Sequence, residues 1–80
     1  MKAAKLKLKL LAGHCTNWRY ADALLLARHC GWELTRTNGS HQILRHTDPA
    51  VATLNLQQKD GQAKAYQMKQ LKEEIELSNL

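Results

Sequence analysis

Apolar residues in the first third of the chain recur at helical spacing, most clearly in residues 18–30. There Trp18 and Leu25 fall on one face of a helix. Thr16 or Asn17 can cap its start, because their side-chain oxygens accept hydrogen bonds from the free N–H groups of a first helical turn. The pattern predicts a helix over this segment.

The residues on either side of this helix have a less uniform pattern. Gly31 is well placed to end the helix in the left-handed conformation, which glycine adopts without a Cβ clash. Residues 1–11 fit two periods at once. Lys and Leu alternate over residues 5–10, as in a strand, while Ala3 and Leu10 fit a helical stripe. Periodicity leaves this first segment open between helix and strand.

From Trp32 onward the period changes to two. Trp32 and Leu34 alternate with polar residues, which predicts a half-buried strand. Asn38 and Gly39 follow, and Asn-Gly is a strong hairpin signal because a type I′ turn needs positive φ at both central residues. The sequence therefore predicts a hairpin whose turn is this dipeptide.

A two-residue loop at this dipeptide fixes which residues face each other across the hairpin. Thr37 would pair with Ser40, and Leu34 would pair with Ile43. The apolar face of the hairpin would then hold Leu34 and Ile43 beside the tryptophan of the first strand. His41 would lie at the rim of that face, near the turn.

The remaining elements follow from the same two periods. Residues 52–57 alternate as a third strand, after a turn at residues 47–49. Residues 58–64 are polar and are predicted to form a loop, after which apolar residues return at helical spacing to about Leu77. The order helix, helix, three antiparallel strands, helix predicts an α+β fold, a single domain over residues 1–80 with the helices packed on one face of the sheet.

The positive charge of the chain indicates a polyanionic partner such as nucleic acid. The 80 residues carry a net charge of +5, with lysines gathered in residues 2–9 and 59–72 and acids in residues 73–76. A soluble basic domain without such a partner fits the same charge. No apolar run approaches the roughly 18 residues of a membrane span, and no signal peptide is recognisable, so we expect a cytoplasmic protein.

The two cysteines give little indication of a disulfide or a metal. In the cytoplasm Cys15 and Cys30 default to reduced thiols. Each follows a histidine, but the spacing of the pairs His14-Cys15 and His29-Cys30 matches no usual zinc-ligand pattern. We therefore expect neither a metal site nor a cofactor.

Three stretches of the chain carry a resemblance to a known family. They are KLLAG at residues 9–13, CGWELTRTNGSHQILRH at residues 30–46 and LNLQQKDGQAKAYQMKQL at residues 54–71, and with the spacing between them they cover nearly the whole chain. Together they resemble the HicA toxins, formerly called YcfA-like proteins, of bacterial toxin-antitoxin pairs. The chain departs from the family pattern at Ala65, where proline is frequent, and at Leu44, where an aromatic residue is frequent.

The resemblance implies a fold, an activity and a partner. HicA proteins are similar in fold to double-stranded-RNA-binding domains, act as ribosome-independent mRNA interferases, and are held inactive by a partner antitoxin, HicB. For this chain the resemblance implies a metal-independent endoribonuclease with mRNA as substrate and a HicB-type antitoxin as partner, the free toxin being monomeric. It assigns the catalytic role to the histidine of Gly-Ser-His, which is His41.

A histidine at this position also suits RNA cleavage on physical grounds. An imidazole can accept or donate a proton near neutral pH, and RNA supplies its own nucleophile, the ribose 2′-hydroxyl. A positioned histidine contributes about 10²–10⁴-fold to such a reaction, which needs neither a metal nor a deep pocket. The backbone amides of Gly39 and Ser40 can approach a phosphate closely, since no large side chain intervenes. Taken alone, a histidine at a strand start is more often a surface or packed residue.

Basic residues on the predicted hairpin and near the last helix are candidate phosphate contacts. The free amides at the start of that helix, near Ala65, would add to them. Each of these charges equally fits a solvated surface residue. The four candidates are Arg36, Arg45, Lys64 and Lys69.

Other conspicuous side chains are interpreted as structural. His46 lies an odd number of residues from His41, so on a regular strand the two rings point to opposite faces, and His46 is taken as a surface residue beside the turn. Tyr66 is predicted to pack on the sheet rather than to stack on a base. Trp18 and Trp32 occupy core-facing positions.

The same features fit a second function, a non-catalytic RNA-binding module of the double-stranded-RNA-binding type. In that case the basic surface reads the shape of an A-form helix, and His41 makes only a hydrogen bond. RNA cleavage, rather than RNA binding, separates the two hypotheses.

Overall fold

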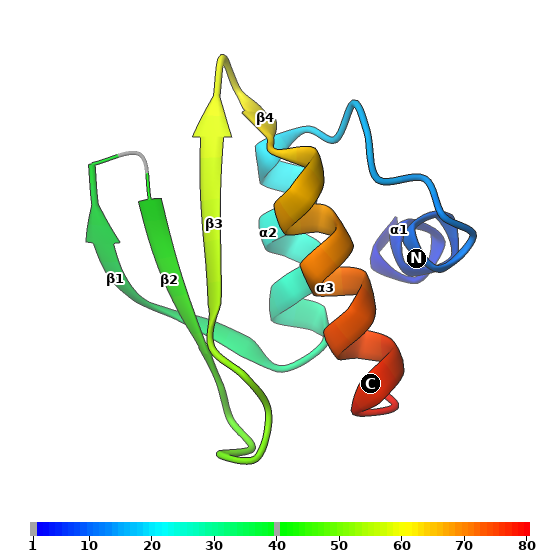
Figure 1. Cartoon of the computed structure of the whole chain (residues 1–80), viewed down its shortest axis with the longest axis vertical. Coiled ribbons are helices and arrows are strands. Elements are labelled where there is room, and N and C mark those ends of the chain that lie inside the picture. Colours follow the sequence, from blue (N-terminus) through cyan, green and yellow to red (C-terminus); the bar gives the residue numbers. More distant parts are fainter. Residues whose placement is uncertain (1, 40) are drawn as a thin grey trace.

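The order of helices and strands confirms the predicted α+β fold and adds one short strand. The structure is a computed structural model that describes residues 2–39 and 41–80. None of the helices in these two ranges is long and apolar enough to span a membrane. In chain order the elements are α1 (Lys2–Leu11), α2 (Tyr20–His29), β1 (Trp32–Asn38), β2 (His41–His46), β3 (Leu54–Lys59), β4 (Gln62–Ala63) and α3 (Ala65–Leu77) (Figure 1).

The helices lie on one side of an antiparallel sheet with the strand order β1-β2-β3-β4. α2 and α3 pack directly against the strands, and α1 packs on α2 and α3, farther from the sheet (Figure 1). Within the described residues no helix covers the opposite side of β1, β2 and β3, which we call the open face. This face is therefore accessible to another molecule.

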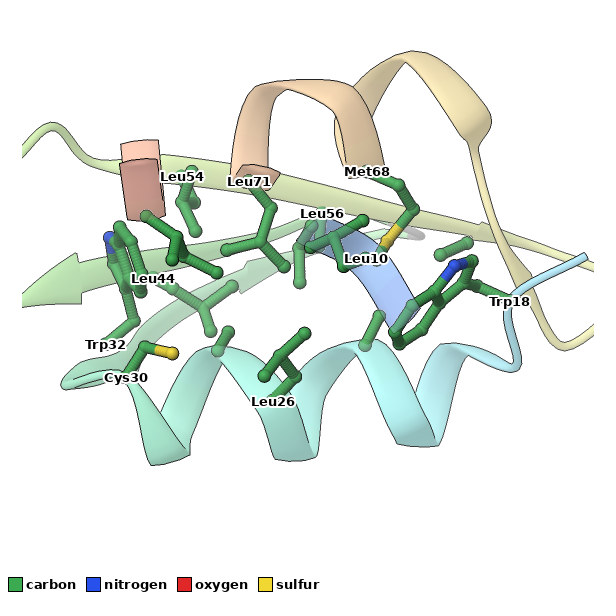
Figure 2. Close-up of a cluster of buried hydrophobic side chains, with 14 of the residues drawn as sticks. Leu10, Trp18, Leu26, Cys30, Trp32, Leu44, Leu54, Leu56, Met68 and Leu71 are labelled. Carbon is green, nitrogen blue, oxygen red and sulfur yellow. The ribbon is translucent and has the colours of Figure 1, made fainter. Parts of the chain in front are cut away.

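The first segment, which periodicity left open, is the helix α1. Ala3 and Leu10 are buried, whereas Leu8 is exposed, so the stripe at helical spacing is the one that meets the rest of the protein. Alanine, lysine and leucine are all strong helix formers, which supports this outcome locally. Leu10 reaches the common core (Figure 2).

α2 begins two residues later than predicted and without the predicted cap. Its N-cap residue is Arg19, which is extended and makes no side-chain capping bond. The cause is tertiary, because the carbonyl of Trp18 accepts a hydrogen bond from the N–H of Ala63 in β4 at 2.9 Å. The residues before α2 therefore run along β4, and the predicted capping by Thr16 or Asn17 is wrong.

The β1–β2 pairing is shifted by two residues of β2 from the predicted pairing. Asn38 pairs with His41, and Thr37 pairs with Gln42. The predicted partner of Thr37, Ser40, lies outside the described residues. Asn38 is thus the last residue of β1 rather than the first residue of the loop, and the predicted register is wrong.

A β-bulge at Thr35 changes the pairing farther along the hairpin. Arg36 pairs with Ile43 and Leu34 with Leu44, so Thr35 is the extra residue, and its hydroxyl donates a hydrogen bond to the Ile43 carbonyl at 3.2 Å. Leu44 is consequently fully buried, whereas Ile43 is partly exposed and Leu34 is 36% exposed. The predicted apolar face of Leu34 and Ile43 is therefore wrong.

Alternation along β2 separates its two histidines. Leu44 and His46 are buried on the helix side of the sheet. Because successive side chains of a strand point to opposite faces, His41, Ile43 and Arg45 lie on the open face. The prediction that the two rings point apart is confirmed.

His46 is a buried ring with both nitrogens hydrogen-bonded, not the predicted surface residue. The N–H of Asp48 donates to Nδ1 at 2.9 Å, so Nε2–H is the donor to the carbonyl of Cys30 at 2.7 Å. The ring also meets Trp32 edge-on, with centroids 4.8 Å apart. Gly31 has the predicted positive φ, +106°, and a Cβ at this residue would lie 2.5 Å from Nε2. The loop after α2 and the end of β2 are thereby joined through one side chain.

The predicted loop of residues 58–64 contains a second hairpin. β3 continues to Lys59 and pairs with β4 across a turn at Asp60 and Gly61. The φ angles of these two residues, 54° and 78°, are both positive, as a type I′ turn requires. A strand of two residues is too short to produce a recognisable period, which is why the sequence pattern indicates a loop.

The core lies between the sheet and the helices (Figure 2). The indole N–H of Trp18 donates to the carbonyl of His14 at 2.7 Å, and that of Trp32 donates to the carbonyl of Ala52 at 2.9 Å. Burial of the rings therefore leaves no polar atom unpaired, and the structural interpretation of both tryptophans is confirmed. The largest fully buried side chains are Trp18, Trp32, Leu10, Leu26, Leu44, Leu54, Leu56, Met68, Leu71 and Ile75.

The fold is expected to lose stability at alkaline pH. Burial raises the pKa of the Cys30 thiol above its ordinary value of 9.0 and that of the Tyr20 phenol above 10.0. A group whose pKa is higher in the folded state than in the unfolded state contributes to the stability of the fold. This contribution is complete below the unfolded-state pKa and is lost as the pH rises through the folded-state pKa. We expect the free energy of unfolding, measured by urea denaturation, to fall above about pH 9. Cys30→Ala should flatten this fall; a slope equal to that of the wild type would contradict the prediction.

Candidate active site on the open face

A shallow depression on the open face gathers residues from three strands near the β1–β2 turn. Its volume is about 380 Å³. Arg36 of β1, Ile43 of β2 and Asn55 of β3 form one cross-strand row, because Ile43 pairs with both of the others. Asn38 and His41, which pair with each other, form the next row toward the turn. These five residues line the depression.

Among the described residues, the His41 ring has a hydrogen-bond partner at one of its nitrogens. Its Nδ1 lies 3.2 Å from Oδ1 of Asn55. A carbonyl oxygen can only accept a hydrogen bond, so in the neutral ring this contact requires the proton on Nδ1 and leaves a lone pair on Nε2. The side chain is only partly exposed, but it borders the depression. Nε2 is therefore able to accept a proton from a molecule bound there.

Arg36 supplies a positive charge to the same depression. The ion pairs formed within the described residues are Lys2 with Asp22 and Lys72 with Glu76, so none of the described acids neutralises Arg36. Its side chain is exposed. A guanidinium in this position presents several donors to an anion and can bind two phosphate oxygens at once.

The turn residues of the predicted site are only partly described. Gly39 is exposed, has a φ of +62°, and has open space where a Cβ would be. Ser40 lies outside the described residues. The close approach of a phosphate to these amides therefore stays a prediction, and at Gly39 the backbone is accessible to it.

The structure separates the other predicted phosphate contacts from His41. Arg45 is on the open face, but it lies four residues along β2, about 13 Å away, and pairs with Glu33. Lys64 is the N-cap of α3 and lines a hollow around the β3–β4 turn. Lys69 borders a different hollow, which includes Cys15. Of the four candidates, only Arg36 shares the depression with the histidine.

Tyr66 is exposed, so its predicted packing on the sheet is wrong. Its relative exposure is 61%. The inward positions at the start of α3 are taken by Met68 and by Gln67, whose Oε1 accepts a hydrogen bond from the backbone N–H of Gln57. The tyrosine is thereby turned outward, and its hydroxyl contacts the side-chain amide of the neighbouring Gln67 at 3.4 Å.

Sequence reasoning missed Asn38, Ile43 and Asn55 as members of the site. Asn38 was interpreted only as a turn residue. Asn55 stands between two buried leucines, so its outward direction follows from the period of β3, but its contact with His41 depends on the register of two strands. The signal in the sequence that could have indicated Asn55 was its place as a polar residue in an alternating strand.

The described residues contain no cluster of candidate metal ligands. Within residues 2–39 and 41–80, no group of three or more His, Cys, Asp or Glu residues is placed to hold a metal ion. Cys15 and Cys30 are buried and free of disulfide bonds.

Comparisons of the chain with known protein families, curated proteins and solved structures give no match.

Proposed function

We propose that this protein is a ribosome-independent endoribonuclease that cleaves mRNA and acts as the toxin of a HicA-type toxin-antitoxin pair. The observation that carries the proposal is the His41 ring, with its Nδ1 hydrogen-bonded to Asn55 and Arg36 beside it in an open depression. The resemblance of Gly-Ser-His and its surroundings to the HicA toxins assigns the catalytic role to the same ring. The helix and strand order agrees with that resemblance.

The proposed reaction needs only the RNA and side chains of the depression. Nε2 of His41 takes the proton of a ribose 2′-hydroxyl, and the 2′-oxygen attacks the adjacent phosphorus. The bond from phosphorus to the 5′-oxygen breaks, and that oxygen takes a proton from solvent. Arg36 neutralises the charge that develops on the phosphate oxygens. The products are a 2′,3′-cyclic phosphate and a 5′-hydroxyl.

The shape of the site supports the proposed substrate and partner. A shallow depression on an open sheet face admits a single RNA strand, whereas a paired strand would hold its 2′-hydroxyls in a fixed helical geometry. A HicB-type antitoxin seated on the open face would cover His41 and Arg36 together. In this proposal the protein acts in the cytoplasm, where mRNA is present.

Incubation with single-stranded RNA tests the proposal at the level of its products. We expect fragments that end in a 2′,3′-cyclic phosphate, unchanged by a chelator of divalent metals. An oligonucleotide with one 2′-deoxyribose should resist cleavage at that nucleotide only, because it lacks the attacking oxygen there. Cleavage after the deoxyribose, or fragments with other ends, would contradict the mechanism.

The alternative, a non-catalytic RNA-binding module, is favoured by basic residues that lie away from the depression. Lys64 and Lys69 border other hollows, and neither is needed for proton transfer at His41. Such a protein would bind RNA and release it intact. The appearance of cleaved RNA therefore decides between the two functions.

A further inference from the structure

Within the part of the chain that the structure describes, the hydrogen-bond partner of the His41 ring is Asn55, a residue on another strand. His41 pairs with Gln57 and Ile43 with Asn55, so the contact between His41 and Asn55 is diagonal across β2 and β3. Such a contact depends on the register of the two strands. It is therefore a property of the sheet, and the hairpin turn alone cannot provide it.

Asn55 is held firmly in its outward position. Its neighbours Leu54 and Leu56 are 1% and 0% exposed and belong to the core (Figure 2). Asn55 also lies within the part of β3 that pairs with β2, where its partner is Ile43. The side chain of Asn55 can therefore reach only the open face, at a fixed place beside His41.

The bond decides which nitrogen of the ring can act as a base. A neutral histidine that lacks a partner favours the tautomer with the proton on Nε2, and that nitrogen is then a donor. A carbonyl oxygen at Nδ1 reverses this preference and leaves the lone pair on Nε2. An amide achieves this without a negative charge, which would instead favour the protonated ring.

We infer that Asn55 is a positioning residue, which holds the His41 ring with its proton on Nδ1 and its basic nitrogen toward the bound RNA. The inference rests on the proposed function for its consequence in catalysis, but the tautomer itself does not depend on it. Asn38 provides a matched comparison, because it lines the same depression and pairs with His41 in the sheet, yet it makes no side-chain bond to the ring.

Nitrogen-15 NMR of the histidine ring, recorded at a pH where the ring is neutral, tests the inference. We expect the wild-type protein and Asn38→Ala to show the tautomer with the proton on Nδ1. Asn55→Ala should shift His41 toward the tautomer protonated on Nε2, and Asn55→Asp, which retains an acceptor, should restore the wild-type form. An Nε2-protonated ring in the wild type, or no change in Asn55→Ala, would overturn the inference. Amide spectra of each variant verify that the sheet is intact.

RNA cleavage by the same variants separates this inference from the proposed function. If both hold, Asn55→Ala lowers kcat by about 10- to 100-fold with little change in KM, as expected for loss of a residue that orients a catalytic group. Asn55→Asp should recover most of the lost kcat only at a pH where the ring is neutral, because the carboxylate also favours the protonated ring, which is no longer a base. If the tautomers respond as expected but the wild type cleaves no RNA, the endoribonuclease function is wrong and the positioning role stands.

Discussion

Replacement of His41 by alanine is expected to lower the rate of RNA cleavage by about 10²–10⁴-fold, the contribution of one positioned proton-transfer group. Nε2 of this ring is the proposed base, and Arg36 alone can stabilise charge on the phosphate but cannot remove a proton. Some cleavage above the uncatalysed rate should remain, because Arg36 and the rest of the depression still bind the RNA.

The fold should tolerate this substitution. His41 is partly exposed, and its side-chain hydrogen bond to Asn55 lies at the surface, so the change in the free energy of unfolding should stay within about 0.5 kcal/mol. RNA cleavage assays and urea denaturation of the same preparations measure both effects.

The matched control is His14→Ala. His14 is exposed, and its contact with Trp18 is made by the backbone carbonyl, which the substitution retains. Cleavage should therefore be unchanged in this variant. Cleavage by His41→Ala at the wild-type rate would exclude the ring from the reaction and remove the proposed base.

The largest expected effect on stability belongs to Gly31→Ala. The φ of +106° is unfavourable for any residue with a Cβ, and the added atom would lie 2.5 Å from Nε2 and 2.9 Å from Cε1 of His46. The ring cannot easily move away, because it is hydrogen-bonded to the backbone carbonyl of Cys30 and the backbone N–H of Asp48 and packs on Trp32. We expect a loss of about 3 kcal/mol, from backbone strain together with at least one broken buried hydrogen bond. For a chain of this length such a loss lowers Tm by roughly 15 °C.

Gly13→Ala isolates the contribution of the His46 contact. Gly13 has a similar φ of +100°, but nothing lies within 4 Å of the added Cβ. Its substitution should cost only the backbone strain, about 1–2 kcal/mol. Thermal denaturation followed by circular dichroism compares the two variants. An equal loss in Gly31→Ala and Gly13→Ala would show that His46 adapts without cost.

Periodicity predicted the elements whose stability depends on their own apolar stripe. α3 places its repeating apolar residues against the sheet, so the spacing in the sequence carried enough information there. The apolar face predicted for α2 is wrong in part, because Leu25 is 41% exposed whereas Ala23, Leu26 and Ala27 are buried. The start of α2 was predicted incorrectly, because the backbone carbonyl of Trp18 accepts a hydrogen bond from β4. That strand is far away in the sequence and too short to show a period.

The hairpin and the site show why a local signal is insufficient for pairing. The Asn-Gly dipeptide indicated the turn, but the turn lies one residue later, and the bulge at Thr35 then places Leu44 rather than Ile43 in the core. His41 was a candidate from a local motif alone, and the structure places it in the depression. Asn55 was not, because only the register of β2 and β3 brings it to the ring.

The bulge at Thr35 also bears on how copies of this protein behave at high concentration. β1 is an edge strand, and a flat edge offers unpaired amides and carbonyls to any other extended chain. The extra residue interrupts that row and increases the local twist, and the charged side chains of Glu33 and Arg36 flank it. We therefore expect the bulge to disfavour pairing of β1 with the edge strand of another copy.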